Sequence, residues 1–127
     1  MNGRPKNGQL TDAQDLVRRT KRFALGVIEA YAGLSKTTVA QILGRQLLRS
    51  GTSVGAQYRE ARRAKSVADF ISKIEGALQE LEETGYWLEL LSESGTMQAV
   101  ALRELQSERE HLTAMLVASA KTAKRRK

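Results

Sequence analysis

Apolar side chains recur every three or four residues along most of the chain, which is the spacing of one helical face. The pattern predicts helices at about 12–32, from Thr37 or Thr38 to about 65, from about 67 to 91, and from about 97 to 121. No segment shows the strict alternation of a half-buried strand, and the single proline, Pro5, leaves the rest of the chain free for long helices. The sequence therefore predicts an all-α protein.

The apolar stripes identify the side chains expected in the core. The first helix carries Leu16, Phe23, Ala24, Val27, Ile28 and Tyr31, and the second carries Val39, Ile42, Leu43, Leu47, Gly51, Val54, Tyr58 and Ala61. The third stripe is the most regular and comprises Val67, Phe70, Ile71, Ile74, Ala77, Leu78, Leu81, Gly85, Leu88 and Leu91. Trp87 lies off this stripe, so it belongs either to a wide core face or to a contact between subunits.

Capping signals mark where several helices begin and end. Thr11 and Gln14 have the spacing of a capping box, and Ser66 with Asp69 has the same spacing before the third helix. Gly33 is expected to end the first helix because glycine tolerates the left-handed conformation. These signals place short turns between long helices.

Small residues occupy the second helix between Ser50 and Ala56. Each glycine there costs about 1 kcal/mol of helix propensity relative to Ala, so a loop at 50–55 is the alternative to a continuous helix. The apolar phase continues through the segment, which favours a helix whose small residues allow a neighbouring helix to approach closely. The predicted helix or subunit contact comprises Gly51, Val54, Gly55, Tyr58 and Trp87.

Four long helices joined by short turns predict an antiparallel up-down-up-down four-helix bundle. We expect the bundle to span residues 11–121, with a flexible basic N-terminal tail at 1–10 and a basic C-terminal tail at 122–127. The chain has no Cys, no N-terminal secretion signal and no apolar run near the roughly 18 residues of a membrane span. We therefore expect a cytoplasmic protein without a membrane partner.

Catalytic chemistry is sparse. His111 is the only histidine, and no phosphate-binding loop or nucleophile with a base can be recognised. Glu108 and His111 have the Glu-x-x-His spacing found in di-iron bundles, but one histidine cannot supply the two motifs that such a site needs. We therefore expect no enzyme, no metal site and no cofactor.

The charge pattern favours a polyanionic partner. The chain carries 21 Lys and Arg against 14 Asp and Glu, a net charge of +7, and the antiparallel topology gathers most of these cations at one pole of the bundle. Cations near helix C-termini also favour the helix dipole, but those of the first helix lie near its N-terminus, where cations are disfavoured. The predicted contacts to RNA or DNA are Arg18, Arg19, Lys21, Arg22, Arg59, Arg62, Arg63, Lys65, Lys124, Arg125, Arg126 and Lys127.

The segment from Leu47 to Leu91 resembles the bacterial four-helix-bundle proteins called 23S rRNA intervening-sequence proteins. The matching residues are Arg49 to Ala56, Tyr58 to Ala61, Asp69-Phe70 and Tyr86 to Glu89. The resemblance implies a ring, typically a homopentamer, and no catalytic residues. It also implies kinship with the accessory variability determinant of diversity-generating retroelements, a basic pentamer that binds nucleic acid and works with a reverse transcriptase. An accessory subunit that binds a reverse transcriptase or another protein is therefore the alternative to a nucleic-acid-binding oligomer.

Overall fold

The computed structural model describes residues 10–126, and these form four helices joined by short turns. The helices are α1 (Asp12–Ala32), α2 (Thr38–Arg62), α3 (Val67–Glu93) and α4 (Ala99–Arg125). The predicted all-α class is confirmed, and so is the continuous second helix, because α2 runs without interruption through 50–55. None of the four helices is long and apolar enough to cross a membrane.

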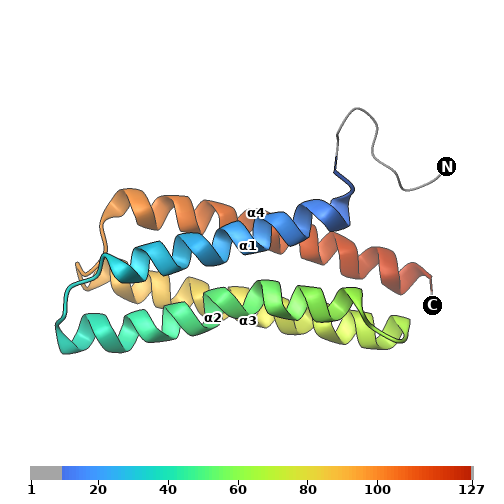
Figure 1. Ribbon diagram of the computed structural model, residues 1–127, viewed down its shortest axis with the longest axis horizontal. Coiled ribbons are helices and arrows are strands. Elements are labelled where there is room, and N and C mark those ends of the chain that lie inside the picture. Colours follow the sequence, from blue (N-terminus) through green and yellow to red (C-terminus); the bar gives the residue numbers. More distant parts are fainter. Residues whose placement is uncertain (1–9, 127) are drawn as a thin grey trace.

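The helices form an antiparallel four-helix bundle in which each helix packs against two neighbours (Figure 1). α1 contacts α2 and α4, while α3 contacts α2 and α4. The contact between α1 and α4 is the least extensive of the four. The start of α1, the end of α2, the start of α3 and the end of α4 lie at one end of the bundle, as the up-down-up-down topology requires.

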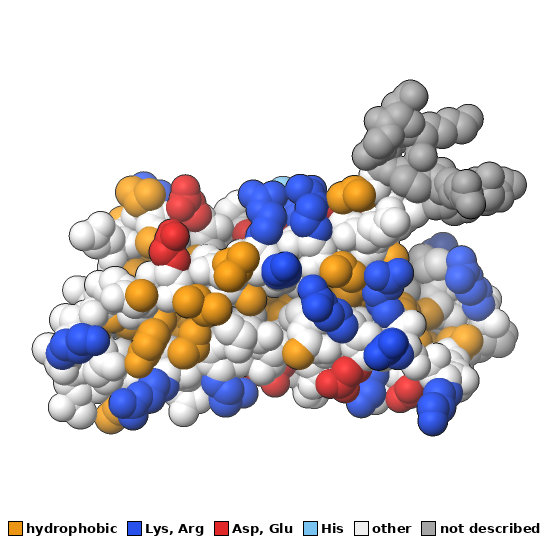
Figure 2. All heavy atoms as spheres, in the orientation of Figure 1, with side chains coloured by type: hydrophobic (Ala, Val, Ile, Leu, Met, Phe, Trp, Pro, Cys, Tyr) orange, Lys and Arg blue, Asp and Glu red, His pale blue; other side chains and the backbone are white. Residues whose placement is uncertain are grey.

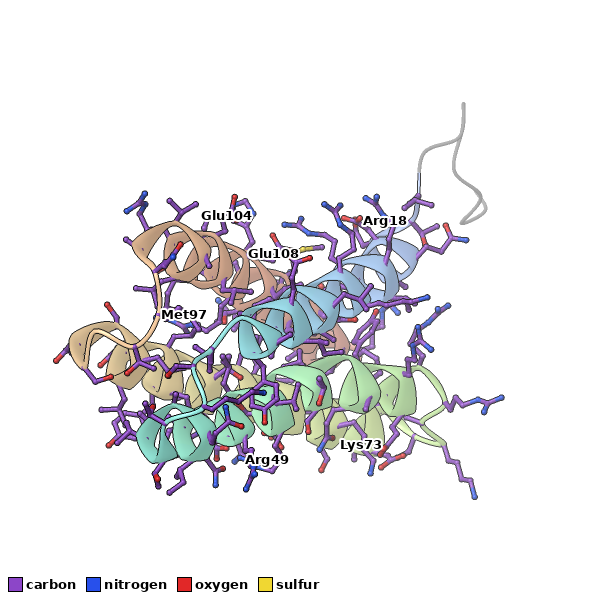
Figure 3. All side chains as sticks on the ribbon, turned by 60° about the vertical axis from the view of Figure 1, so that its left-hand side comes forward. Arg18, Arg49, Lys73, Met97, Glu104 and Glu108 are labelled. Carbon is purple, nitrogen blue, oxygen red and sulfur yellow. The ribbon has the colours of Figure 1, made fainter. Side chains whose placement is uncertain are left out.

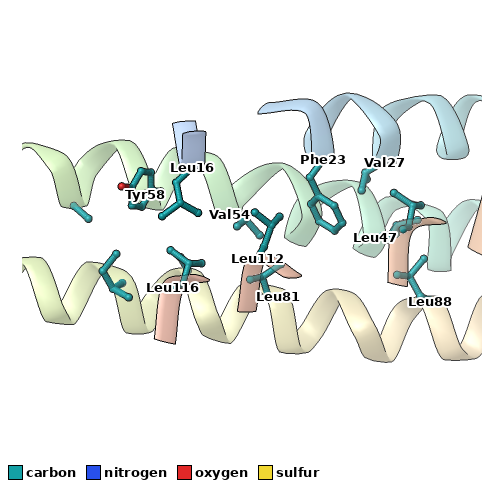
Figure 4. Close-up of a cluster of buried hydrophobic side chains, with 14 of the residues drawn as sticks. Leu16, Phe23, Val27, Leu47, Val54, Tyr58, Leu81, Leu88, Leu112 and Leu116 are labelled. Carbon is teal, nitrogen blue, oxygen red and sulfur yellow. The ribbon is translucent and has the colours of Figure 1, made fainter. Parts of the chain in front are cut away.

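The core runs along the bundle axis and receives side chains from all four helices (Figure 4). Its fully buried members include Val27, Leu47, Leu81 and Leu112, each with 0% of its surface exposed. Two buried hydroxyls cross the α2–α3 contact, where Thr84 Oγ1 donates to Ser50 Oγ at 2.9 Å. Both hydroxyl groups therefore have partners away from water, which keeps the cost of burying them small.

Glycines of α2 bring its backbone close to α1. A Cβ at Gly51 would lie 2.7 Å from Val27 Cγ2, and a Cβ at Gly55 would lie 3.1 Å from Thr20 Oγ1. Real Cβ atoms essentially never approach side chains as closely as 2.7 Å. The small residues therefore serve a contact between two helices of the same chain.

The helix ends follow the capping predictions with three differences. Thr11 and Gln14 form the complete predicted box, with Gln14 N donating to Thr11 Oγ1 at 3.1 Å. Ser66 caps α3, but Asp69 accepts from the backbone of Lys65, so that box is only half formed. Gly33 ends α1 as predicted, but its φ of −86° is not left-handed, so only the expected left-handed conformation is wrong. α4 continues past the predicted end at Lys121 to Arg125.

Four residues predicted to face the core are instead exposed, one of them Val67 at the start of α3, which is 37% exposed. Val39 and Ile42 of α2 are each 55% exposed, and Ile28 of α1 is 45% exposed. On α2 the small residues Ala40 and Gly44 take the buried positions, because α1 and its following turn lie too close to admit larger side chains. The larger apolar residues beside them therefore point to solvent.

Candidate nucleic-acid interface

The topology brings most of the predicted basic residues to one end of the bundle. We define the basic pole as the N-terminal half of α1, the C-terminal end of α2 with the turn after it, and the C-terminal end of α4. Figure 2 shows several Lys and Arg side chains over this half of the α1–α2 face. Lys127 lies outside the described residues.

Most cations of the basic pole are available to a partner. Eight of the predicted contacts are exposed and have no carboxylate within 4.0 Å among residues 10–126: Lys21, Arg22, Arg59, Arg62, Arg63, Lys65, Arg125 and Arg126. Arg18 pairs with Asp15 at 3.1 Å and Lys124 with Glu75 at 3.7 Å, and both cations remain 55% exposed. Exposed pairs of this kind are worth at most about 1 kcal/mol, so they can exchange for a phosphate contact.

Arg19 differs from the neighbouring cations of α1 because it pairs with a carboxylate of another helix. Its guanidinium makes a two-pronged contact with Glu108, with Nε to Oε2 at 2.9 Å and Nη2 to Oε1 at 2.8 Å. Hydrogen bonding to Glu108 raises the pKa of the Arg19 guanidinium above its ordinary value. Glu108 lies between α4 and α1 (Figure 3), so Arg19 joins these helices. A phosphate reaching Arg19 would compete with this carboxylate.

The candidate metal arrangement on α4 has no supporting geometry. His111 is exposed, and its Nδ1 lies 3.0 Å from Nη2 of Arg19. Within residues 10–126, no group of three or more His, Cys, Asp and Glu residues is arranged to hold a metal ion.

The five predicted contact residues lie mainly inside the protomer. Gly51, Val54 and Tyr58 are buried and Gly55 is partly buried, so these four serve contacts between helices. Trp87 is partly buried and packs against the core, and its ring lies 5.2 Å from that of Tyr86. Tyr86 is 54% exposed, so the outer edge of this aromatic pair stays open to a second subunit.

The basic pole contains a cleft, which could not be predicted from the helical pattern of the sequence. It lies between the start of α1, the turn after α2 and the last turns of α4, and its volume is about 710 Å³. Leu16, Phe70 and Met115 give it apolar walls, and its charged lining includes Arg62, Lys65 and Arg126. We call it the pole cleft. Its walls come from four helices, so only the three-dimensional packing brings them together.

A second groove follows the other half of the α1–α4 contact. It has a volume of about 960 Å³, and its lining includes Phe23, Gly26 and Leu105 with Arg22 and Glu104 at charged positions. The Arg19–Glu108 pair lines this second groove and not the pole cleft, and both hollows border the α1–α4 contact, the least extensive helix contact of the bundle.

The fold and this surface define a class: an antiparallel four-helix bundle with a cationic pole. Residues 13–118 match the model of the 23S rRNA-intervening sequence protein family, and the chain belongs to that family. A similar solved structure is that of a protein of unknown function from the S23 ribosomal protein family of Bacteroides thetaiotaomicron. It is 32% identical with a TM-score of 0.82, and the match covers 87% of this chain and 99% of the other. A search of curated proteins found no similar sequence.

Proposed function

We propose that this protein is a non-enzymatic homo-oligomer that binds nucleic acid, RNA in the first place, through its basic pole. The observation that carries the proposal is the group of eight exposed cations in one half of the bundle without a carboxylate partner within 4.0 Å among residues 10–126. Cations without intramolecular partners can each replace a condensed counterion on a phosphate backbone. The five aromatic side chains of the described core are buried or partly buried, which favours backbone contacts over stacking on an open platform.

The opposite half of the bundle supports assembly. Six of the nine exposed large apolar residues belong to that half, namely Leu25, Ile28, Val39, Ile42, Tyr86 and Val100, while Leu10, Val67 and Val117 lie toward the basic pole. Figure 2 shows hydrophobic side chains grouped over the C-terminal half of α1 and the adjoining part of α2. Contiguous apolar surface of this kind marks protein contacts. We infer that this half holds the subunit contacts of a ring, a homopentamer as the family resemblance implies, and leaves the basic poles free.

Binding to the backbone is tested by a salt titration. The association constant of the 127-residue chain for a duplex RNA and a single-stranded RNA is measured between 50 and 300 mM salt by fluorescence anisotropy. With about six phosphate contacts, log K should fall with log salt with a slope of roughly −4 to −5. A flat dependence, or the absence of binding at low salt, removes the proposal, and an acidic protein partner would then be the better use of these cations.

Assembly through the apolar half is tested with Ile42→Glu. A charge at this position must be desolvated in a subunit contact but remains in water in a free protomer, since Ile42 is 55% exposed. We expect the variant to fall from the oligomer to the 14.0 kDa monomer in light scattering, with an unchanged circular dichroism spectrum.

The matched control is Gln79→Glu, which adds the same charge at another exposed position, on α3. It should retain the mass of the parent protein. If the parent is itself a monomer at micromolar concentration, or if both variants dissociate equally, the ring arranged through this half is wrong.

A further inference from the structure

The pole cleft combines an apolar interior with a cationic rim, which the proposed backbone contacts do not require. Phe70 and Met115 are partly exposed and offer apolar surface, and Arg62, Lys65 and Arg126 are exposed cations with no carboxylate within 4.0 Å among the described residues. The volume of about 710 Å³ lies inside the range of about 300–1,000 Å³ that is usual for small-ligand sites. Both features suit a ligand with a flat apolar part and an attached anion.

Tyr58 adds a polar group inside the cleft. The residue is only 2% exposed, lines the cleft, and its hydroxyl makes no hydrogen bond to any described residue. Figure 4 shows this hydroxyl directed along α2 toward the helix end that forms the pole. Burial raises the pKa of the Tyr58 hydroxyl above its ordinary value, with Arg62 acting against the shift and Asp12 adding to it. The hydroxyl therefore stays protonated and can donate to a bound molecule.

The positions of the charges orient a bound molecule. Asp12 lines the α1 side of the cleft, where it would repel a phosphate but can accept from a ring N–H or an exocyclic amine. Lys65 comes from the turn after α2 and Arg126 follows the end of α4, and both cations can hold a phosphate. A nucleotide offers both groups: a base edge that can donate to Asp12 and a phosphate that can bind the cations.

We propose that the pole cleft receives one unpaired nucleotide of an RNA strand, with the base against Phe70 and Met115, the Tyr58 hydroxyl bonded to the base edge, and the phosphate on Arg62, Lys65 and Arg126. The inference rests on the proposed function and adds a preference for unpaired nucleotides over continuous duplex. A base in a duplex is stacked on both faces and cannot enter a cleft, whereas a bulged base leaves the helix at low cost.

The test uses three RNAs that share one sequence: a continuous duplex, the same duplex with one bulged nucleotide, and that bulge without its base. Affinities of the 127-residue chain are measured at fixed salt. The bulged RNA should bind about tenfold more tightly than the other two, which corresponds to one base–aromatic contact. Quenching of a 2-aminopurine placed in the bulge should report entry of the base.

Two variants on the same turn of α2 separate the cleft from the surrounding charge. Arg62→Gln changes a cation that lines the cleft, and Arg59→Gln changes an exposed cation that does not. Arg62→Gln and Tyr58→Phe should reduce the preference for the bulge severalfold, while Arg59→Gln should weaken all three RNAs equally. Tyr58→Phe keeps the buried ring and so keeps the fold.

Equal affinity for the three RNAs, together with salt-dependent binding, overturns this inference and leaves the proposed function intact. An equal loss from Arg62→Gln and Arg59→Gln across all three RNAs overturns it in the same way. The absence of any RNA binding overturns both.

Discussion

Replacing Arg59, Arg62 and Arg63 together by glutamine should lower the affinity for RNA by about 10²- to 10³-fold near 0.1 M salt. All three are exposed at the end of α2 and have no carboxylate within 4.0 Å in the described part of the chain. Each cation that neutralises a phosphate contributes about 0.9 to the slope of log K against log salt, so the slope should become less steep by roughly 2.7. The measurement is the anisotropy titration described above, repeated at four salt concentrations.

The matched control neutralises the same number of cations at the other end of the bundle. Lys36, Arg45 and Arg103 are exposed, and within residues 10–126 they have no ion-pair partner. Their triple replacement by glutamine gives the same net charge but should reduce the slope by less than about 1. If the two triple variants weaken binding equally, net charge alone attracts the RNA and the basic pole is not the interface.

Folding must be checked in the first variant, because its arginines also stabilise a helix end. Cations in the last turn of a helix contribute about 0.3–1 kcal/mol each through the helix dipole. The variant is therefore compared with the parent by circular dichroism at the temperature of the binding measurement. An unchanged spectrum assigns the loss of affinity to the interface.

The helices could be predicted from the sequence because their determinants are local. Thr11 and Gln14 lie three residues apart, and the side chain of each accepts a hydrogen bond from the backbone N–H of the other. The start of α1 can therefore be predicted without the rest of the fold. The up-down-up-down arrangement follows from short turns between long helices, and it alone was sufficient to gather the cations at one pole.

The misassigned faces have a common cause. Hydrophobicity ranks Val39 and Ile42 above Ala40 and Gly44, yet the smaller pair is buried, and a Cβ at Gly44 would already lie 2.7 Å from Leu34 Cδ1. The pattern locates an apolar stripe, but which side of it packs depends on the space that the neighbouring helix leaves. The exposed larger residues thereby become candidates for a subunit contact, which a monomer sequence pattern cannot distinguish from core.

Pairings across the bundle depend on the register of two helices. Arg19 and Glu108 are 89 residues apart, so neither residue signals the other in the sequence. Arg18, Arg19 and Arg22 are three arginines of the same helix, but only Arg19 of the three pairs with a carboxylate of another helix among residues 10–126. The pole cleft has the same origin, since it arises where α1 and α4 diverge.

Gly51→Ala should lower the free energy of unfolding by about 1–2 kcal/mol, although alanine is the better helix former by about 1 kcal/mol. The added Cβ would lie 2.7 Å from Val27 Cγ2 and 3.0 Å from its Cγ1. Val27 is fully buried and β-branched, so it has no free rotamer into which it can move, and α1 must shift instead. Urea unfolding at one fixed protein concentration measures the change, since an oligomer's stability depends on concentration.

Gly76→Ala is the matched substitution, at a glycine in the middle of α3. Its Cβ would lie 2.9 Å from Gln57 Oε1, the end of a flexible side chain that can turn away. The gain in helix propensity should then dominate and raise the free energy of unfolding by roughly 0.5–1 kcal/mol. The two variants make the same chemical change and differ only in what surrounds it. If both stabilise the protein, the α1–α2 contact has room for a methyl group, and close packing is not the reason for glycine at position 51.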